Sequence, residues 1–486
     1  MRYFDLAVIV VYLIGITLFG ARFRHSQKTL KDYFLGGRDT PWWAIAFSIV
    51  SAETSTLTVI GTPALAFYGN FGFLQVVFGY LLARVVITVL LLPHYYRGEM
   101  YTAYELMQRR FGWRIRRLTA GAFLVLRALA EGVRVFAISI VISIVLGTGE
   151  TASILLIVCL TLFYTFEGGM TAVIWTDVVQ MFLYIAGAIL SLFVILDKIP
   201  GGWPHVWETA SAAGKFQLFD FRLAAPAEFF SRTYSFWAGI IGGCFLTTAS
   251  HGTEQLMVQR LLAARSQAEG RTALLASWVV IFFQFSLFLL IGAILFVYYQ
   301  GAQLPPPSPA DRIYPDFIWK HLPTGVAGLV IAAILAAAMS NLSAALNSLA
   351  STTVMDFLKP AAKSDRSDAS WLALARRVTI VWGGILFAIA VLAQGVKSVL
   401  EAGLAIASVV YGALLGTFLL GVLTRRVQEK AAMAGMVAGL LTMLYVRLGT
   451  SIAWTWYVGI GTTVTFLTAL LVSWLIKEEP VGPTSS

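Results

Sequence analysis

The chain has 486 residues, of which 58% are hydrophobic and only 12% are charged, and its mean hydropathy is +0.78. Soluble domains carry about 25% charged residues, so this composition excludes a soluble protein and indicates a polytopic membrane protein. The net charge is +10, but the basic residues lie in short loops between apolar runs, which argues against a nucleic-acid-binding face.

We predict an all-α protein with about thirteen membrane-spanning helices, because a spanning helix needs about 20 apolar residues. The predicted spans begin near Leu6, Trp42, Leu74, Leu118, Ala152, Thr171, Trp237, Ala273, Val326, Val378, Val399, Ala431 and Trp454. An odd number of spans places the termini on opposite sides of the membrane. With the N-terminus outside, about 23 of the 35 Lys and Arg residues lie on the inner side, so positive charge favours this orientation in a cytoplasmic (inner) membrane.

The loops carry some structure of their own. Residues 200–234 and 300–323 are outer segments whose Trp, Pro and Phe content predicts that they pack onto the protein. Residues 101–112 predict a short amphipathic helix at the inner membrane surface.

The second span concentrates polar residues where a lipid-facing helix would have none. They are Ser51, Glu53, Thr54, Ser55, Thr56 and Thr58, followed by Gly61 and Pro63. Such a segment is typical of a broken helix whose freed carbonyls face a cavity or an ion. The alternative is a kinked packing helix in which Ser and Thr bond back to the chain.

The seventh span is interrupted in a comparable way by Gly242, Gly243, Thr247, Thr248, Ser250, His251 and Gly252. Two interrupted helices, each opening a five-span half, predict an inverted-repeat transporter. We expect one transmembrane domain over 1–486, with an accessory helix at 1–24, repeats at 40–200 and 233–426, two accessory helices at 428–477 and a tail at 478–486. His251 by itself is more often a satisfied buried histidine than a ligand.

Charged residues inside spans are costly and are therefore candidates for function. Arg127, Glu131 and Arg134 share one face of the fourth span, either as an internal ion-pair network or with Arg134 free for a substrate anion. Arg84 in the third span has the same two interpretations. Asp177 in the sixth span needs a cation, a proton or an arginine as its partner.

The ninth span carries a stripe of small or oxygen-bearing side chains, namely Ala333, Ala337, Ser340, Asn341, Ala344 and Ser348. Small residues allow another helix to approach closely, which is one interpretation of the stripe. The other is a cation site built around Ser340.

Four runs of sequence resemble the sodium/solute symporter family, which includes sodium–glucose, sodium–proline and sodium–sialic acid carriers. They are DYFLGGR (32–38), GGMTAVIWTDVVQ (168–180), GTEQLMVQRLLAARS (252–266) and LLGTFLLGVLTRR (414–426). The resemblance implies a leucine-transporter-type core of 5+5 helices in inverted repeats, with one helix before it and two after it.

The resemblance also implies a sodium site between the first and eighth core helices. Its ligands would be the carbonyls of Ser51, Thr54 and Ala337 and the side chains of Ser340 and Asn341. Some family members bind a second sodium, for which Asp177 and Ser343 match, but Ala344 stands where a further hydroxyl would be. We therefore expect one coupled sodium.

The substrate itself does not follow from the resemblance. Sugar-binding members have an acidic residue and an amide where this chain has Leu57 and Thr58, so a hexose is not expected. The expected pocket residues are Glu53, Ser55, Thr58, Arg134, Thr247, His251 and Tyr411. This set suits a small polar solute, with a preference for a carboxylate.

We therefore predict sodium-coupled symport of a small polar organic solute by alternating access, with Na+ as the only cofactor and a monomer as the functional unit. A proton-coupled carrier that uses Asp177 or Glu53 is the first alternative. A membrane sensor or a membrane-embedded enzyme is a distant one, because the sequence carries no recognisable catalytic or phosphate-binding motif.

Overall fold

The computed structural model describes residues 2–22, 38–97, 103–164, 170–223, 225–358 and 368–476. Within these ranges the regular elements are helices, and one bridge pairing joins Thr40 to Ala264. Ten helices are long and apolar enough to cross a membrane, and the bent pair α3–α4 makes an eleventh candidate. The predicted all-helical membrane architecture is therefore confirmed.

The helices of the first half follow in chain order. They are α1 (Tyr3–Ala21), α3 (Trp42–Glu53), α4 (Thr56–Tyr68), η3 (Phe71–Phe73), α5 (Leu74–Val86), η4 (Ile87–Leu91), α6 (Leu92–Tyr95), α7 (Ala103–Phe111), α8 (Trp113–Leu146), α9 (Glu150–Tyr164) and α10 (Met170–Asp197). Helix α7 lies where the sequence predicted a short amphipathic helix.

The second half begins with the outer helices α11 (Gly202–Ala212) and α12 (Pro226–Ser231). It continues with α13 (Phe236–Gly252), α14 (Gln255–Leu262), α15 (Gln267–Gly301), η5 (Ala310–Arg312), α16 (Ile313–His321), α17 (Val326–Thr352) and η6 (Thr353–Leu358). The last elements are α19 (Asp368–Leu392), η7 (Ala393–Gly395), α20 (Val399–Leu423), α21 (Glu429–Gly449), η8 (Trp454–Trp456) and α22 (Tyr457–Leu475).

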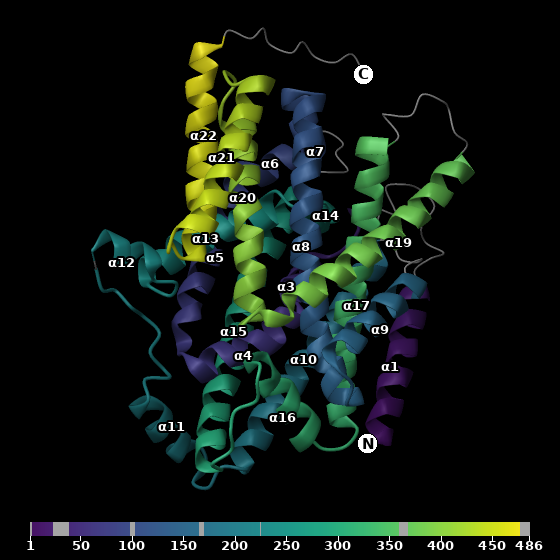
Figure 1. Cartoon of the computed structure of the whole chain (residues 1–486), viewed down its shortest axis with the longest axis vertical. Coiled ribbons are helices and arrows are strands. Elements are labelled where there is room, and N and C mark those ends of the chain that lie inside the picture. The colour runs from purple at the N-terminus through teal and green to yellow at the C-terminus, as the bar shows by residue number, and fades with distance from the viewer. Residues whose placement is uncertain are drawn as a thin grey trace.

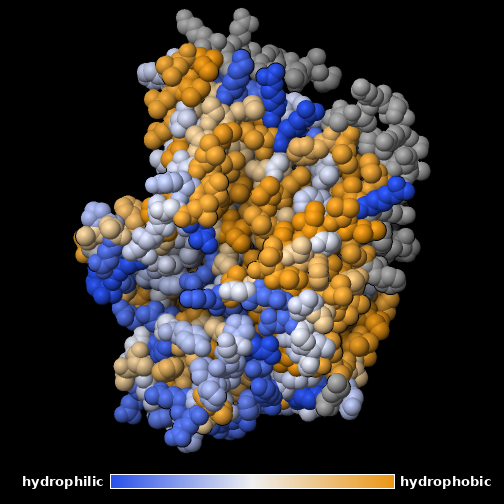
Figure 2. Space-filling view, in the orientation of Figure 1, coloured by the Kyte–Doolittle hydropathy of each residue, from blue (hydrophilic) through white to orange (hydrophobic). Residues whose placement is uncertain are grey.

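The two ends of the long axis carry different elements (Figure 1). Helix α1 begins at the end that also carries α11 and α16, whereas α7 and the end of α22 lie at the opposite end. Figure 2 shows hydrophobic side chains over the flank that carries α1 and α19, and hydrophilic side chains around α11 and α16. Val11 and Leu18 of α1 and Ile380 and Val381 of α19 are exposed. Such a surface is compatible with lipid hydrocarbon along the flank of α1 and α19 and with water at the end that carries α11 and α16.

Close packing of α5 on α13 depends on glycine. A Cβ atom on Gly243 would lie 2.2 Å from the Val76 carbonyl oxygen, and one on Gly79 would lie 2.6 Å from the Ile240 carbonyl oxygen. Small residues at such interfaces let helix backbones approach each other, which drives association in a membrane where apolar burial does not.

The two outer segments pack onto the helices, as the sequence predicted. The Lys215 Nζ donates to the Phe67 and Gly69 carbonyl oxygens at 2.6 and 3.1 Å, where α4 ends. A cation at this position satisfies carbonyls that the helix leaves unpaired. Arg312 in η5 reaches Ser143 at the end of α8 and Glu150 at the start of α9.

Asp311 in η5 joins this outer segment to the start of α20. Its Oδ2 accepts the Val399 N–H at 3.0 Å, and its Oδ1 is buried without a hydrogen-bond partner among the described residues. Burial raises the pKa of the Asp311 carboxyl from 3.8 to about 6, against the lowering effect of the Val399 N–H.

Replacing Asp311 by Asn should remove a pH dependence of stability. Because the folded-state pKa is raised, the stability contributed by protonated Asp311 is complete below pH 3.8 and is lost as the pH rises through about 6. Asp311→Asn should therefore match the wild type near pH 4 and exceed it near pH 8, by up to about 3 kcal/mol. Thermal unfolding in detergent across this range checks the expectation.

The matched control is Asp197→Asn at the exposed end of α10, which should leave the pH profile unchanged. An Asp311→Asn protein that is less stable than the wild type at both pH values would contradict the role given to this carboxyl.

Candidate functional site

The first broken helix bends by 64° between α3 and α4. The break falls at Thr54 and Ser55, where the Ser55 N–H turns back to the Glu53 carbonyl at 3.2 Å. In the part of the chain that the structure describes, no backbone N–H reaches the carbonyls of Ser51, Ala52 or Thr54. Free carbonyls at a break are the groups that can coordinate a cation within a membrane.

Hydrogen bonds from side chains on both sides of the break stabilise it. The Thr54 Oγ1 donates to the Val50 carbonyl at 2.7 Å and accepts a hydrogen bond from Gln284 Nε2 on α15. The Thr58 Oγ1 donates to the Glu53 carbonyl at 3.4 Å. Pro63 lies inside α4, away from the break, so the polar residues rather than the proline end α3.

Glu53 is the charged residue at the end of α3. Its Oε2 lies 2.7 Å from Arg84 NH2 on α5 and 3.3 Å from His251 Nε2 on α13. Arg84 is fully buried and also donates to Ser277 Oγ at 3.1 Å. The pairing neutralises both charges in a region where an isolated charge would be costly.

The second break lies further along the chain than the sequence predicted. Helix α13 runs without interruption from Phe236 to Gly252, and α14 begins at Gln255. The expected interruption at Gly242 and Gly243 is absent because these residues serve close packing instead: a Cβ atom on Gly242 would lie 2.3 Å from the Thr455 carbonyl oxygen. Thr253 and Glu254 form the break.

Glu254 connects the second break to two other helices. Its Oε1 lies 3.1 Å from Arg127 NH1 on α8, and its Oε2 accepts a hydrogen bond from Tyr411 on α20 at 2.5 Å. Arg127 is also 3.4 Å from Glu131 Oε2, which in turn lies 3.1 Å from Arg134 NH1. The predicted charged face of α8 is thus an ion-pair network that extends to α13–α14.

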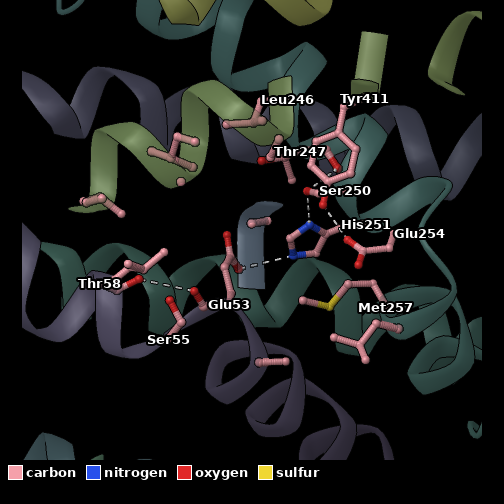
Figure 3. Close-up of a pocket in the computed structure, with 18 of the residues that line it drawn as sticks. Glu53, Ser55, Thr58, Leu246, Thr247, Ser250, His251, Glu254, Met257 and Tyr411 are labelled. Atoms are coloured by element: carbon pink, nitrogen blue, oxygen red, sulfur yellow. Dashed lines mark hydrogen bonds and ion pairs between the residues drawn. The ribbon is translucent and has the colours of Figure 1, made fainter. Parts of the chain in front are cut away.

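A cavity lies between the two breaks and encloses about 1000 Å³, including space that is open to solvent. Figure 3 shows Glu53, Ser55 and Thr58 on one side of it and Thr247, Ser250, His251, Glu254 and Tyr411 on the other. The structure brings all of the predicted substrate residues to its wall, namely Glu53, Ser55, Thr58, Arg134, Thr247, His251 and Tyr411. Their role in binding stays a prediction.

The predicted sodium ligands on the ninth span lie on a regular helix. Helix α17 is continuous through Ala337 and Asn341, and it contacts the first broken helix mainly along α4. The side chain of Ser340 lies outside the described residues. The structure therefore places the Ser51 and Thr54 carbonyls at a break, whereas the bridge from them to Ala337, Ser340 and Asn341 stays a prediction.

Asp177, expected at a second sodium site with Ser343, has other partners. Its Oδ2 lies 3.0 Å from Arg260 NH2 and accepts a hydrogen bond from Ser48 Oγ at 2.7 Å. Arg260 Nε also donates to Ser48 at 3.0 Å. These three residues join α3, α10 and α14. Of the three partners that the sequence left open for Asp177, namely a cation, a proton or an arginine, the structure shows the arginine.

Comparison with known proteins gives the family. The model of the sodium:solute symporter family matches residues 33–439, which is most of the chain. The chain belongs to the sodium:solute symporter family. It is therefore a sodium-coupled solute symporter, and its family consists of transporters rather than enzymes.

Two curated relatives extend this comparison. The sodium/sialic acid symporter SiaT of Proteus mirabilis is 29% identical over 474 residues, which cover 94% of this chain and 92% of the relative. The human sodium/iodide cotransporter is 29% identical over 456 residues, which cover 92% of this symporter and 69% of the relative. The relatives carry different solutes, so family membership alone leaves the solute open.

Solved structures place the fold. A Na+-coupled sialic acid symporter in a substrate-bound outward-open state matches with a TM-score of 0.83 and 28% identity, over 98% of this chain and 99% of the other. Mhp1, a nucleobase-cation-symport-1 family transporter, matches with a TM-score of 0.53 and 12% identity, over 91% and 94% of the two chains, and supports the fold alone. The predicted leucine-transporter-like fold class is thereby confirmed, while the count of thirteen helices stays a prediction.

Sequence reasoning missed Glu254 and Ser250 as cavity residues and did not pair Glu53 with Arg84. Glu254 had a visible signal, because it is an acidic residue directly after the interrupted segment that ends at Gly252. No signal in the sequence pointed to the partners of Glu53 and Glu254, because these partners lie on other helices that come together only in the folded protein.

Removing Arg260 should destabilise the symporter more than removing an exposed arginine. The Arg260 and Asp177 side chains are only 3% and 9% exposed, so Arg260→Met leaves a buried carboxylate unpaired at a cost of about 3–5 kcal/mol. The double variant Asp177→Asn/Arg260→Met should recover most of the loss. Thermal unfolding in detergent measures all three proteins.

Arg265→Met is the control, because its ion pair with Asp39 is exposed and should contribute about 0–1 kcal/mol. Equal losses for Arg260→Met and Arg265→Met would count against the buried pairing of Asp177.

Proposed function

We propose that the symporter carries a small organic solute with a carboxylate group into the cell, driven by sodium through alternating access. The observation that carries the proposal is the pair of helix breaks that face one cavity. Ala52, whose carbonyl accepts no backbone N–H within the described residues, lines this cavity together with the predicted solute contacts Glu53 and Ser55. The expected core comprises two inverted repeats within thirteen spans, with the N-terminus outside and the C-terminus inside the cytoplasmic membrane.

Sodium would couple to the solute by binding one conformation more tightly than the other. The proposed ligands are the carbonyls of Ser51, Thr54 and Ala337 and the side chains of Ser340 and Asn341. An ion that joins the first break to α17 would favour the conformation in which the cavity accepts solute. The membrane potential adds about 2.3 kcal/mol per charge per 100 mV to the driving force.

The contacts of the two acidic candidates favour sodium over protons as the coupling ion. A proton carrier needs a carboxylate that gains and loses its proton in each cycle. Glu53 instead lies 2.7 Å from Arg84, and Asp177 lies 3.0 Å from Arg260. Both guanidiniums stabilise the charged carboxylate. The ion pair of Asp177 with Arg260 would accordingly hold α14 against α3 and α10 in this conformation. It would separate when the cavity opens to the cytoplasmic side.

The coupling ion is tested in proteoliposomes. An inward sodium gradient without a pH gradient should drive uptake of the transported carboxylate, and a proton gradient without sodium should not. Counterflow with a panel of labelled organic acids identifies the solute at the same time. Uptake driven equally well by the proton gradient alone would overturn sodium coupling.

Ser340→Ala should raise the sodium concentration that gives half-maximal uptake, because it removes one proposed ligand and leaves the helix intact. The same variant should raise the sodium concentration needed for thermal stabilisation of the purified protein without solute. Ser348→Ala is the matched control on the same helix, because the Ser348 hydroxyl donates to the Ala344 carbonyl at 2.8 Å within α17. Unchanged sodium dependence in Ser340→Ala would count against the site.

A further inference from the structure

Glu254 lies at the start of α14, but its carboxylate faces the cavity and does not bond to that helix. It is the N-cap residue of α14, with an extended backbone at φ −85° and ψ 130°, yet its carboxylate makes no capping hydrogen bond to that helix. Ser, Thr, Asp and Asn at this position ordinarily accept an N–H from the first turn, whereas Glu is not among the preferred N-cap residues. The Glu254 carboxylate points instead to the cavity wall, towards Tyr411 (Figure 3).

Two donors from two helices hold this carboxylate. Arg127 NH1 lies 3.1 Å from Oε1, and the Tyr411 hydroxyl donates to Oε2 at 2.5 Å. Both donors line the cavity. A guanidinium and a phenol aimed at the two oxygens of one carboxylate form a charge-assisted receptor for a carboxylate group. Without solute, the receptor holds the carboxylate of the protein itself.

The charges around this receptor are balanced before any solute enters. Arg127 and Arg134 face Glu131 and Glu254, and Glu131 lies close to both arginines. On the other side of the cavity Glu53 pairs with Arg84. A solute carboxylate on the same two donors would place a second negative charge beside Glu254 at a largely buried site, which is costly unless one of the resident carboxylates withdraws.

Glu254 is the resident carboxylate that can withdraw. Glu131 lies in the middle of the long helix α8 and is fully buried between two arginines. Glu254 lies in the non-helical linker between α13 and α14, where a change of backbone angles moves the side chain without breaking a helix. Linker positions of this kind are where hinge motions are absorbed.

We propose that Glu254 is a tethered competitor for the solute: a solute carboxylate replaces it on Arg127 and Tyr411, and its release frees the second break to move. This inference rests on the proposed function. It assigns the acid group of the solute to Arg127 and Tyr411 rather than to Arg134 alone. It also links solute binding to the motion of α14, because Glu254 ties that break to α8 and α20.

The remaining wall of the cavity limits the body of the solute. Apolar side chains dominate it near this receptor, including Leu126, Leu246, Leu404 and Ala407. Ser55 and Thr247 also line the cavity and carry hydroxyls that a polar group of the solute can contact. The cavity therefore fits a small carboxylate that combines an apolar body with a few polar groups.

The test compares binding of charged and uncharged probes to the full-length protein in detergent with saturating sodium. The probes are butyrate, benzoate and N-acetylneuraminate, together with butyramide and benzamide as uncharged counterparts. Glu254→Gln keeps the shape and an acceptor for Tyr411 but removes the competing charge. It should lower the concentration for half-maximal thermal stabilisation by butyrate or benzoate by at least about fivefold and leave the amides unchanged.

Two further variants separate the exchange from a purely structural role. Tyr411→Phe in the Glu254→Gln background removes one donor where no competing charge is present, and it should weaken carboxylate binding relative to Glu254→Gln alone. Glu401→Gln is the matched control, because it removes a similar contact, the Tyr234 hydroxyl bond to Glu401 Oε1 at 2.5 Å, away from the cavity wall. It should leave the carboxylate affinity unchanged. Should Glu254→Gln be poorly folded, Glu254→Asp tests the same point, because its shorter side chain competes less well for Arg127.

The outcomes distinguish the inference from the proposed function. Sodium alone should stabilise the wild type; failure of that stabilisation overturns sodium coupling. If sodium stabilises the protein but neither butyrate nor benzoate adds to it, or if Glu254→Gln fails to improve carboxylate binding, the exchange is overturned and sodium coupling stands. In transport, Glu254→Gln should lower KM and also lower the maximal rate, because tighter binding no longer drives the release of the second break.

Discussion

The cost of an unpaired charge inside a membrane governs the interior of this symporter. Three carboxylates near the centre of the bundle, those of Glu53, Glu131 and Asp177, each lie within about 3 Å of a guanidinium nitrogen from Arg84, Arg134 and Arg260. Except for the α8 pair, these contacts join different helices. Buried charges therefore fix how helices are placed as well as neutralising one another. A conformational change that separates two such helices must supply a new partner to each charge, which limits the motions that the bundle can make.

The two helix breaks expose different chemical groups, backbone carbonyls at the first and a carboxylate at the second. The first leaves the carbonyl oxygens of Ser51, Ala52 and Thr54 without a backbone donor among the described residues, and such unwound carbonyls are groups that can coordinate a cation in transporters. The second carries a formal charge, because Glu254 lies in the linker itself. The proposed cation site would thus lie beside the first break, and the proposed anion receptor at the second. This asymmetry would not follow from an inverted repeat of backbone alone; it comes from the residues that occupy the two linkers.

The sequence predicted what depends on local composition and missed what depends on distant partners. A run of Ser, Glu and Thr around Thr54 could be interpreted as a break because those side chains compete with helical hydrogen bonds, as the Thr54–Val50 contact does. The second break was expected too early because glycine has two uses. Gly242 and Gly243 permit close packing against Thr455 and Val76 rather than interrupting the helix. The pairing of Glu53 with Arg84 depends on the rotation of two helices about their axes, which hydropathy does not determine.

Charge balance gives a physical reason for sodium and an anionic solute to travel together. A cavity that is neutral when empty gains a negative charge with a carboxylate and a positive charge with a sodium ion. Each ligand alone leaves a charge that a low-dielectric interior opposes, whereas the two together restore neutrality. The favourable interaction between them does not require direct contact, because Coulomb energy falls only slowly with distance where water is excluded. Under the proposed exchange, withdrawal of Glu254 from Arg127 would be the local response to the solute, while an ion at the first break would compensate the charge that remains.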